Sequence, residues 1–186
     1  GRVVTREGVK ADPTKIQIVK DWIIPVTVKD VRSYLGFASY YRDFQPNFAL
    51  IVYPLNELLK NNTSRAQGGN KVNWTEECQY AFNRVKEMLT SAPVLGYPML
   101  DGKYQLDTDA SGYAMAGILS QIQHGKEVVL SYASNGFNLS QKNYCTTKRE
   151  LLAVVAYMQK FRHFLEGHTK YVIRTDHKAL FWCHLN

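Results

Sequence analysis

The chain has 186 residues, of which 45% are hydrophobic, so it can bury a substantial core in one large or two small domains. Its net charge of +7 favours polyanionic partners, although basic residues of this kind are also typical of solvated helix faces. The sequence lacks a signal peptide, an apolar run of roughly 20 residues and any disulfide or zinc spacing among its three cysteines, which predicts an intracellular protein without a membrane partner.

The first third of the chain favours helices. A hairpin is expected over residues 1–9, and Asp12 followed by Pro13 is a strong signal for the start of a helix. Apolar residues at the helical period predict a second helix over 28–44 and a third helical segment over 46–59. We therefore expect residues 1–60 to form a small, mostly helical unit.

The rest of the chain changes from helix to strand patterns. Residues 61–70 are the clearest linker, because turn residues dominate there, and Thr75 then begins a helix that ends before Pro93. Four strands are expected over 104–109, 114–121, 128–133 and 171–175, with a turn at His124 and Gly125 and helices over 147–165 and 177–185. This order predicts an α+β fold, with a helical region followed by a mixed sheet on which helices pack.

Three carboxylates define the candidate site: Asp109, Glu150 and Asp176. The pattern places the two aspartates at strand ends and Glu150 near the start of a helix. If the two strands are adjacent and parallel, all three side chains meet at one end of the sheet, within several ångströms of one another. Hard cations such as Mg²⁺ prefer oxygen ligands, and a pair of them supports in-line cleavage of a phosphodiester. The sequence therefore predicts a nuclease in which these three residues are both catalytic and metal-binding.

Each carboxylate also has a purely structural interpretation. Asp109 suits a turn, Asp176 suits the cap of a following helix, and Glu150 fits a capping box that begins at Thr147. Asp107 is a rival to Asp109, because strand alternation puts both on one face, although Asp107 lies further from the strand end. Capping explains the acids singly, whereas it does not explain a meeting of all three.

Several motifs resemble the ribonuclease H domain of gypsy-type LTR retrotransposon polyproteins. They include Leu-Asp-Thr-Asp-Ala-Ser at 106–111, Glu-Leu-Leu-Ala-Val-Val at 150–155 and Thr-Asp-His-Lys-Ala-Leu at 175–180, with further matches at 118–121, 131–134, 143–147 and 161–164. Upstream, residues 12–15, 31–42, 74–77 and 89–95 resemble the thumb and connection of the same reverse transcriptases.

The resemblance implies a palm end and thumb over 1–60, a linker and connection helix over 61–100, and the N-terminal part of a ribonuclease H domain over 101–186. That family cleaves the RNA strand of RNA–DNA hybrids with two Mg²⁺ ions, for which Mn²⁺ is an alternative. Its first Asp, its Glu and its second Asp match Asp109, Glu150 and Asp176. The implied partners are an RNA–DNA hybrid and the rest of the Pol polyprotein.

Two features of the family have no match in this sequence. The Tyr-x-Asp-Asp turn of the polymerase site is absent, and a fourth carboxylate belongs to a later segment. We therefore expect a C-terminally truncated ribonuclease H domain that is weakly active or inactive by itself. The alternative is a non-catalytic, nucleic-acid-binding remnant of a transposon-derived protein.

Overall fold

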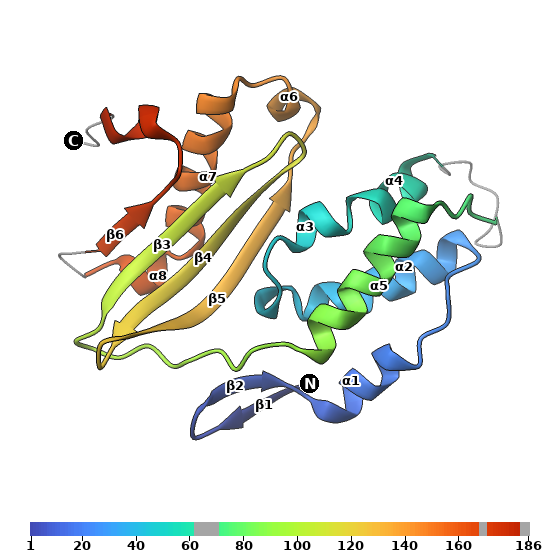
Figure 1. The fold of residues 1–186 in the computed structure, drawn as a ribbon, viewed down its shortest axis with the longest axis horizontal. Helices are drawn as coiled ribbons and strands as arrows, with labels where there is room; N and C mark the ends of the chain where they lie inside the picture. Colours follow the sequence, from blue (N-terminus) through green and yellow to red (C-terminus); the bar gives the residue numbers. More distant parts are fainter. Residues whose placement is uncertain (62–70, 168–170, 183–186) are drawn as a thin grey trace.

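The computed structural model describes residues 1–61, 71–167 and 171–182, and it places a helical part beside a four-stranded sheet (Figure 1). The predicted α+β fold is confirmed. The predicted linker over 61–70 lies outside the described residues, apart from its first position. Within the described ranges, none of the helices combines the length and the apolar character required to cross a bilayer.

The helical part begins with the expected hairpin and continues through five helices. The hairpin pairs β1 (Arg2–Thr5) with β2 (Gly8–Ala11), and it is followed by α1 (Pro13–Lys20), α2 (Val28–Tyr40), the 3-10 turn η1 (Arg42–Phe44), α3 (Phe48–Ile51), α4 (Tyr53–Asn61) and α5 (Glu76–Thr90). Asp12 caps α1 by accepting from the Thr14 N–H, and Thr75 caps α5 by accepting from the Cys78 N–H, as predicted. The helix predicted over 28–44 ends at Tyr40 and tightens into η1.

One core joins the helices of this part. Tyr34 on α2 and Phe82 on α5 are buried with ring centroids 4.6 Å apart, and the Tyr34 hydroxyl donates to the Phe82 carbonyl at 2.9 Å. Burying a side chain of this size stabilises the fold by about 1.5–3 kcal/mol. Helix α5 therefore shares the core of residues 1–60, although the domain boundaries expected from the sequence remain predictions.

The sheet has the strand order β5-β4-β3-β6. Strands β3 (Lys103–Ala110), β4 (Ala114–Gln123) and β5 (Lys126–Gly136) form antiparallel neighbours, whereas β6 (Tyr171–Arg174) pairs with β3 in parallel. His124 and Gly125 both have positive φ, 50° and 78°, as a two-residue hairpin turn of this hand requires. The predicted strands and turn are thus confirmed.

Helices α6 (Leu139–Lys142), α7 (Thr146–Lys160) and α8 (Arg162–Leu165) follow β5, and the 3-10 helix η2 (Lys178–Trp182) follows β6. The single helix predicted over 147–165 is wrong in its extent, because it breaks at Phe161. Phe161, at the break, and Leu165, after it, are both buried in the sheet core. The helix predicted over 177–185 is a short 3-10 helix where the structure describes it.

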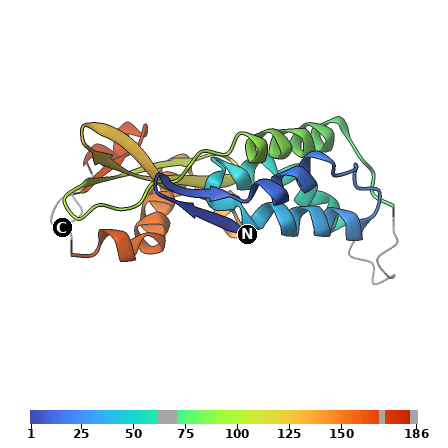
Figure 2. The same ribbon diagram turned by 90° about the horizontal axis from the view of Figure 1, so that it is seen from below.

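Helix α7 packs on one face of the sheet, and Figure 2 shows α7 and α8 on the same side. The Tyr157 ring lies directly over Gly117 of β4, where an added Cβ would come within 2.7 Å of the ring. The Tyr157 hydroxyl donates to the Met115 carbonyl at 2.8 Å. These contacts set the position of α7 against β3 and β4.

The two parts of the molecule meet along β5. Arg42 of η1 donates to the Ser134 carbonyl at 2.7 Å, and the Ala49 N–H donates to the Ser134 hydroxyl at 2.9 Å. The hairpin β1–β2 reaches from the helical part toward the sheet (Figure 2), and Val9 forms a bridge with Leu95 in the segment that leads to β3. The helical part is therefore fixed to the sheet by backbone and side-chain hydrogen bonds.

Candidate metal centre

The parallel pairing of β3 and β6 brings Asp109 and Asp176 to one end of the sheet. The register opposes Leu106 to Ile173 and Asp107 to Arg174, and two residues further along the chain the same offset reaches Asp109 and Asp176. Because side chains alternate along a strand, residues two apart lie on the same face. The sequence therefore places both aspartates together just where β3 and β6 end.

Glu150 comes from α7, which lies across β3 and β4. The residue is only 4% exposed, because it belongs to the buried face that also carries Ala153, Val154 and Tyr157. The capping-box interpretation is wrong, since the N-cap of α7 is Cys145 and no side chain caps the helix there. Thr147 lies inside the first turn, so Glu150 is free to point at the strand ends.

The three carboxylates converge as the sequence predicted. One ligand oxygen from each of Asp109, Glu150 and Asp176 lies within 4.8 Å of the others, with Glu150 buried and both aspartates exposed. Oxygen atoms this close can share a hard cation. The prediction of convergence is confirmed.

The surroundings of Glu150 disfavour its ionised form. Burial raises the pKa of Glu150 above its usual value, and the charges of Asp109 and Asp176 raise it further, while the Ala110 N–H and His177 partly offset the shift. The buried Glu150 Oε2 has no hydrogen-bond partner among the residues that the structure describes. An unpartnered carboxylate oxygen beside two more carboxylates fits a divalent metal ion, and these three residues would hold it.

Asp107, the rival of Asp109, has a different environment. Arg174 forms an ion pair with Asp107 and donates to Glu127 Oε1 at 2.6 Å across the sheet. Both interactions raise the pKa of Arg174, and the Arg174 guanidinium lowers the pKa of Glu127. Asp107 is therefore neutralised within the protein, which separates it from the candidate site.

Two contacts that sequence reasoning missed support the site. Arg149 Nη1 donates to the Ser111 carbonyl at 2.9 Å and ties α7 to the turn after Asp109. Thr147 Oγ1 lies 2.9 Å from His177 Nε2 and ties the start of α7 to the residue after Asp176. Each of the four residues is close in sequence to a site carboxylate, which was the available signal, but only the tertiary structure pairs them.

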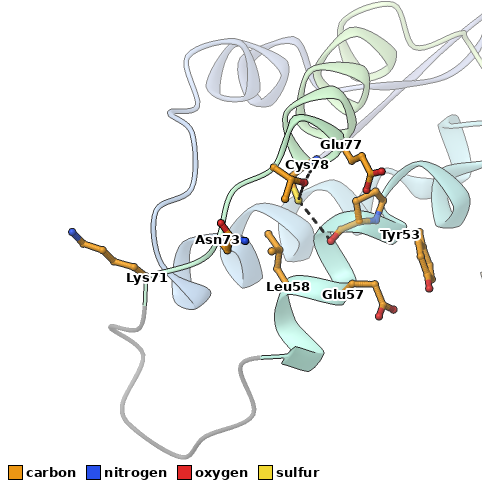
Figure 3. A pocket seen from close by; sticks show the side chains of 9 residues that line it. Tyr53, Glu57, Leu58, Lys71, Asn73, Glu77 and Cys78 are labelled. Carbon is orange, nitrogen blue, oxygen red and sulfur yellow. Dashed lines mark hydrogen bonds between the residues drawn. The ribbon is translucent and has the colours of Figure 1, made fainter.

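A hollow of about 470 Å³ lies away from the carboxylates, between α4 and α5 (Figure 3). Tyr53, Glu57 and Glu77 are among its lining residues, and the Cys78 thiol donates weakly to the Pro54 carbonyl at 3.9 Å. The carboxylate cluster, by contrast, is open at the end of the sheet. An open site of that kind suits a large ligand better than a small molecule enclosed in a pocket.

A mixed sheet with a parallel strand beside its first strand, a helix across one face and carboxylates at the strand ends is typical of the ribonuclease H-like class of proteins. Comparison with known sequences agrees with this class. The chain belongs to the family described as the RNase H-like domain found in reverse transcriptase, whose model matches residues 74–173. The resemblance to gypsy-type retrotransposon polyproteins is confirmed by its relatives.

Three Drosophila melanogaster proteins, each a retrovirus-related Pol polyprotein, illustrate the relationship. The chain is 32% identical to that of transposon opus over 184 residues, 36% to that of transposon 297 over 186 and 37% to that of transposon gypsy over 185. These alignments cover 97%, 99% and 97% of this chain but only 18%, 16% and 18% of the relatives. The chain thus spans less than a fifth of each relative.

Solved structures of a foamy viral protease-reverse transcriptase share the fold. The one in complex with an RNA/DNA hybrid has a TM-score of 0.75 at 21% identity and covers 94% of this chain and 23% of its own. The one in complex with dsDNA has a TM-score of 0.77 at 21% identity and covers 97% of this chain and 36% of its own. At this identity the likeness shows the fold alone.

Proposed function

We propose that Asp109, Glu150 and Asp176 bind Mg²⁺ or Mn²⁺ and that the chain supplies the ribonuclease H function of a larger reverse transcriptase, hydrolysis of the RNA strand in an RNA–DNA hybrid. The observation that carries the proposal is the convergence of three carboxylates from separate elements within 4.8 Å. Family membership and the relatives' Pol polyproteins support the same function.

The residues of such a site have different roles. Glu150 is fixed by burial in α7, so it holds its carboxylate in one place, while the exposed Asp109 and Asp176 face the solvent from which a nucleic acid arrives. Bound divalent metal would supply Lewis-acid activation of the phosphodiester and of the attacking water. Arg149 keeps the turn after Asp109 in place through Ser111. No serine, cysteine or histidine nucleophile is required.

The proposal is tested on the full 186-residue chain with two independent readouts. Thermal unfolding is followed during titration with Mn²⁺ or Mg²⁺, and the RNA strand of an end-labelled RNA–DNA hybrid is analysed for cleavage. The variants are Asp109→Asn and, as a control, Asp101→Asn, which changes an exposed aspartate in the loop that precedes β3. A ligand that binds the folded state raises the melting temperature.

We expect the metal to stabilise the wild type and Asp101→Asn but not Asp109→Asn, and we expect any cleavage to be confined to the RNA strand and to require Asp109. A chain that shows no metal response would overturn the metal centre. A chain that binds metal and hybrid yet never cuts would be the non-catalytic remnant, which overturns the hydrolytic part of the proposal.

A further inference from the structure

A cationic–aromatic cluster lies at the junction between the helical part and the end of the sheet that carries the carboxylates. We propose that this cluster, formed by Tyr53, Tyr113 and Lys142, is a contact site for the sugar–phosphate backbone of the duplex substrate. The inference rests on the proposed function, because it assigns the surface along which the duplex reaches the carboxylates.

Each residue of the cluster comes from a different element. Tyr53 begins α4, Tyr113 lies in the β3–β4 turn, four residues after Asp109, and Lys142 ends α6. The two tyrosine rings have centroids 4.8 Å apart. Lys142 Nζ lies 4.8 Å from the Tyr53 centroid and 5.6 Å from the Tyr113 centroid, and it donates to the Tyr53 hydroxyl at 3.2 Å.

The two tyrosines position the Lys142 ammonium group but do not neutralise its charge. Among the described residues no carboxylate lies within ion-pair distance of its ammonium group, whereas Lys60, which approaches the same Tyr53 ring at 5.9 Å, pairs with Glu57 at 2.7 Å. Attraction to the ring faces orients a cation without removing its charge. An ammonium group has three N–H donors, and only one of those on Lys142 is used by Tyr53, so two remain for an external acceptor.

The chemistry of the cluster fits a nucleic-acid backbone. Phosphate oxygens accept from lysine and tyrosine, and an exposed tyrosine face packs on sugars or bases without regard to sequence. Tyr113 is 51% exposed, so it presents such a face. Tyr53 also lies at the rim of the hollow in the helical part (Figure 3), where its ring is near the surface.

The position of the cluster agrees with this role. The β3–β4 turn that carries Tyr113 lies between α6 and the α3–α4 segment (Figure 1). Asp109 and Ser111 line a shallow depression together with Leu50 of α3, so the carboxylate end of the sheet faces the helical part. A rigid duplex that extends from the helical part to Asp109 would therefore pass over Tyr113 and Lys142.

A purely structural role is the competing interpretation. The junction is already joined by Arg42 and Ala49, both of which bond to Ser134, so a further brace is not required. The two interpretations differ in what the loss of the Lys142 charge changes: a brace affects stability, whereas a backbone contact affects hybrid affinity and its dependence on salt.

The test is the binding of a fluorescein-labelled RNA–DNA hybrid to the full chain, measured by anisotropy in EDTA over a series of salt concentrations. The variants are Lys142→Gln, Lys142→Arg and Tyr113→Leu. The matched control is Lys126→Gln, which removes the same charge from the first residue of β5, directly after the turn at the opposite end of the sheet. Melting temperatures of all variants are measured in parallel.

We expect Lys142→Gln to weaken binding by about tenfold and to reduce the salt slope by about one phosphate contact, with Lys142→Arg close to wild type. Tyr113→Leu should weaken binding several-fold, and Lys126→Gln should have little effect. Equal affinities for Lys142→Gln and Lys126→Gln would overturn the inference, and a lower melting temperature with unchanged affinity would show that the cluster is a brace.

The failure of this inference can be distinguished from that of the proposed function. EDTA removes any contribution of metal and cleavage to the binding measurement, and the metal-induced rise in melting temperature does not involve Lys142. A chain that loses affinity on Lys142→Gln but shows no metal response would retain the contact site and lose the nuclease proposal. A chain that is stabilised by metal but binds the hybrid equally well with and without Lys142 would retain the nuclease proposal and lose the contact site.

Discussion

Two groups of carboxylates are each built around a residue of β3 and a residue that lies in or directly after the neighbouring strand β6, and they differ in how their charge is balanced. In the first group, Asp107 and Glu127 share Arg174, whose guanidinium reaches both. In the second group, Asp109 and Asp176 lie two residues further along the same register and meet Glu150. A shift of two residues along β3 and β6 thus replaces an arginine, Arg174, with a third acid, Asp176.

The difference separates acids that are paired with a cation of the protein itself from acids that are left without one. Arg174 supplies the cation of the first group from within the chain, so its ion pairs with Asp107 and Glu127 stabilise the sheet. The second group has a buried oxygen without a partner among the described residues, and burial together with repulsion from the two aspartates raises the pKa of Glu150. The protein therefore carries a local excess of negative charge that a divalent metal ion would balance.

The largest expected effect is that of Glu150→Gln. This variant should abolish the metal-induced rise in melting temperature, because the buried ligand is lost. In the absence of metal it should be more stable than the wild type by about 1 kcal/mol, or roughly 2–4 °C, since one of three repelling charges is removed. Thermal unfolding with and without Mn²⁺ measures both, with the exposed Glu7→Gln as control. If Mn²⁺ raises the melting temperature of Glu150→Gln as much as that of the wild type, Glu150 is not a metal ligand and the second group does not need a metal ion to balance its charge.

The next effect concerns the contact between Thr147 and His177, which ties the first turn of α7 to the residue beside Asp176. Thr147→Val should lower Mn²⁺ affinity by about tenfold, because outer contacts orient metal ligands. Isothermal titration with Mn²⁺ measures the affinity, and Ser140→Ala, which removes an exposed hydroxyl in α6, is the comparison. If Thr147→Val and Ser140→Ala bind Mn²⁺ equally well, the contact does not position the site.

Arg174→Met tests the first group. It should destabilise the chain by about 1 kcal/mol, a modest value because the arginine is 42% exposed and exposed pairs are screened by solvent. The metal response should be retained, because Arg174 does not reach the three-carboxylate cluster. Thermal unfolding in high and low salt measures the loss. A metal response that disappears with Arg174 would mean that the two groups act as one.

The smallest expected effect is a pH dependence. Because the pKa of Glu150 is raised above its ordinary value of 4.5, ionisation of this residue destabilises the folded state above that raised pKa. As pH falls through the raised pKa toward 4.5, Glu150 gains its proton and the stability difference between Glu150→Gln and the wild type should narrow. Unfolding of both proteins in metal-free buffers between neutral and mildly acidic pH measures this; a constant difference would contradict the raised pKa.

Much of the fold was predictable because its signals are local. Asp12 and Thr75 cap their helices through bonds to residues two or three positions away, and the turn at His124 and Gly125 needs only those two residues. The convergence of the carboxylates was also predictable, because it requires that β3 and β6 be parallel neighbours and that the apolar face of α7, at whose edge Glu150 lies, pack on the sheet.

The errors come from features that local patterns do not determine. The period of apolar residues runs on through Phe161, which is buried in the sheet core, so it gives no signal of the helix break at that residue. The alternative interpretation of Thr147 as a helix cap rests on a local pattern, but α7 begins after Cys145, so Thr147 lies within its first turn. Only the arrangement of strands shows that Asp107 meets Arg174, a partner 67 positions away in the sequence.

The close contact of Gly117 with Tyr157 couples the packing of α7 on β4 to the position of Glu150. Tyr157 lies two helical turns, about 10 Å, from Glu150 on the same face of the helix. A methyl group at Gly117 would lie 2.7 Å from the Tyr157 ring. If α7 tilts to relieve this clash, the first turns of the helix, which carry Glu150, move as well. The smallest residue in β4 therefore influences the alignment of a carboxylate that it does not touch, because it lets the helix that carries Glu150 lie close against the sheet.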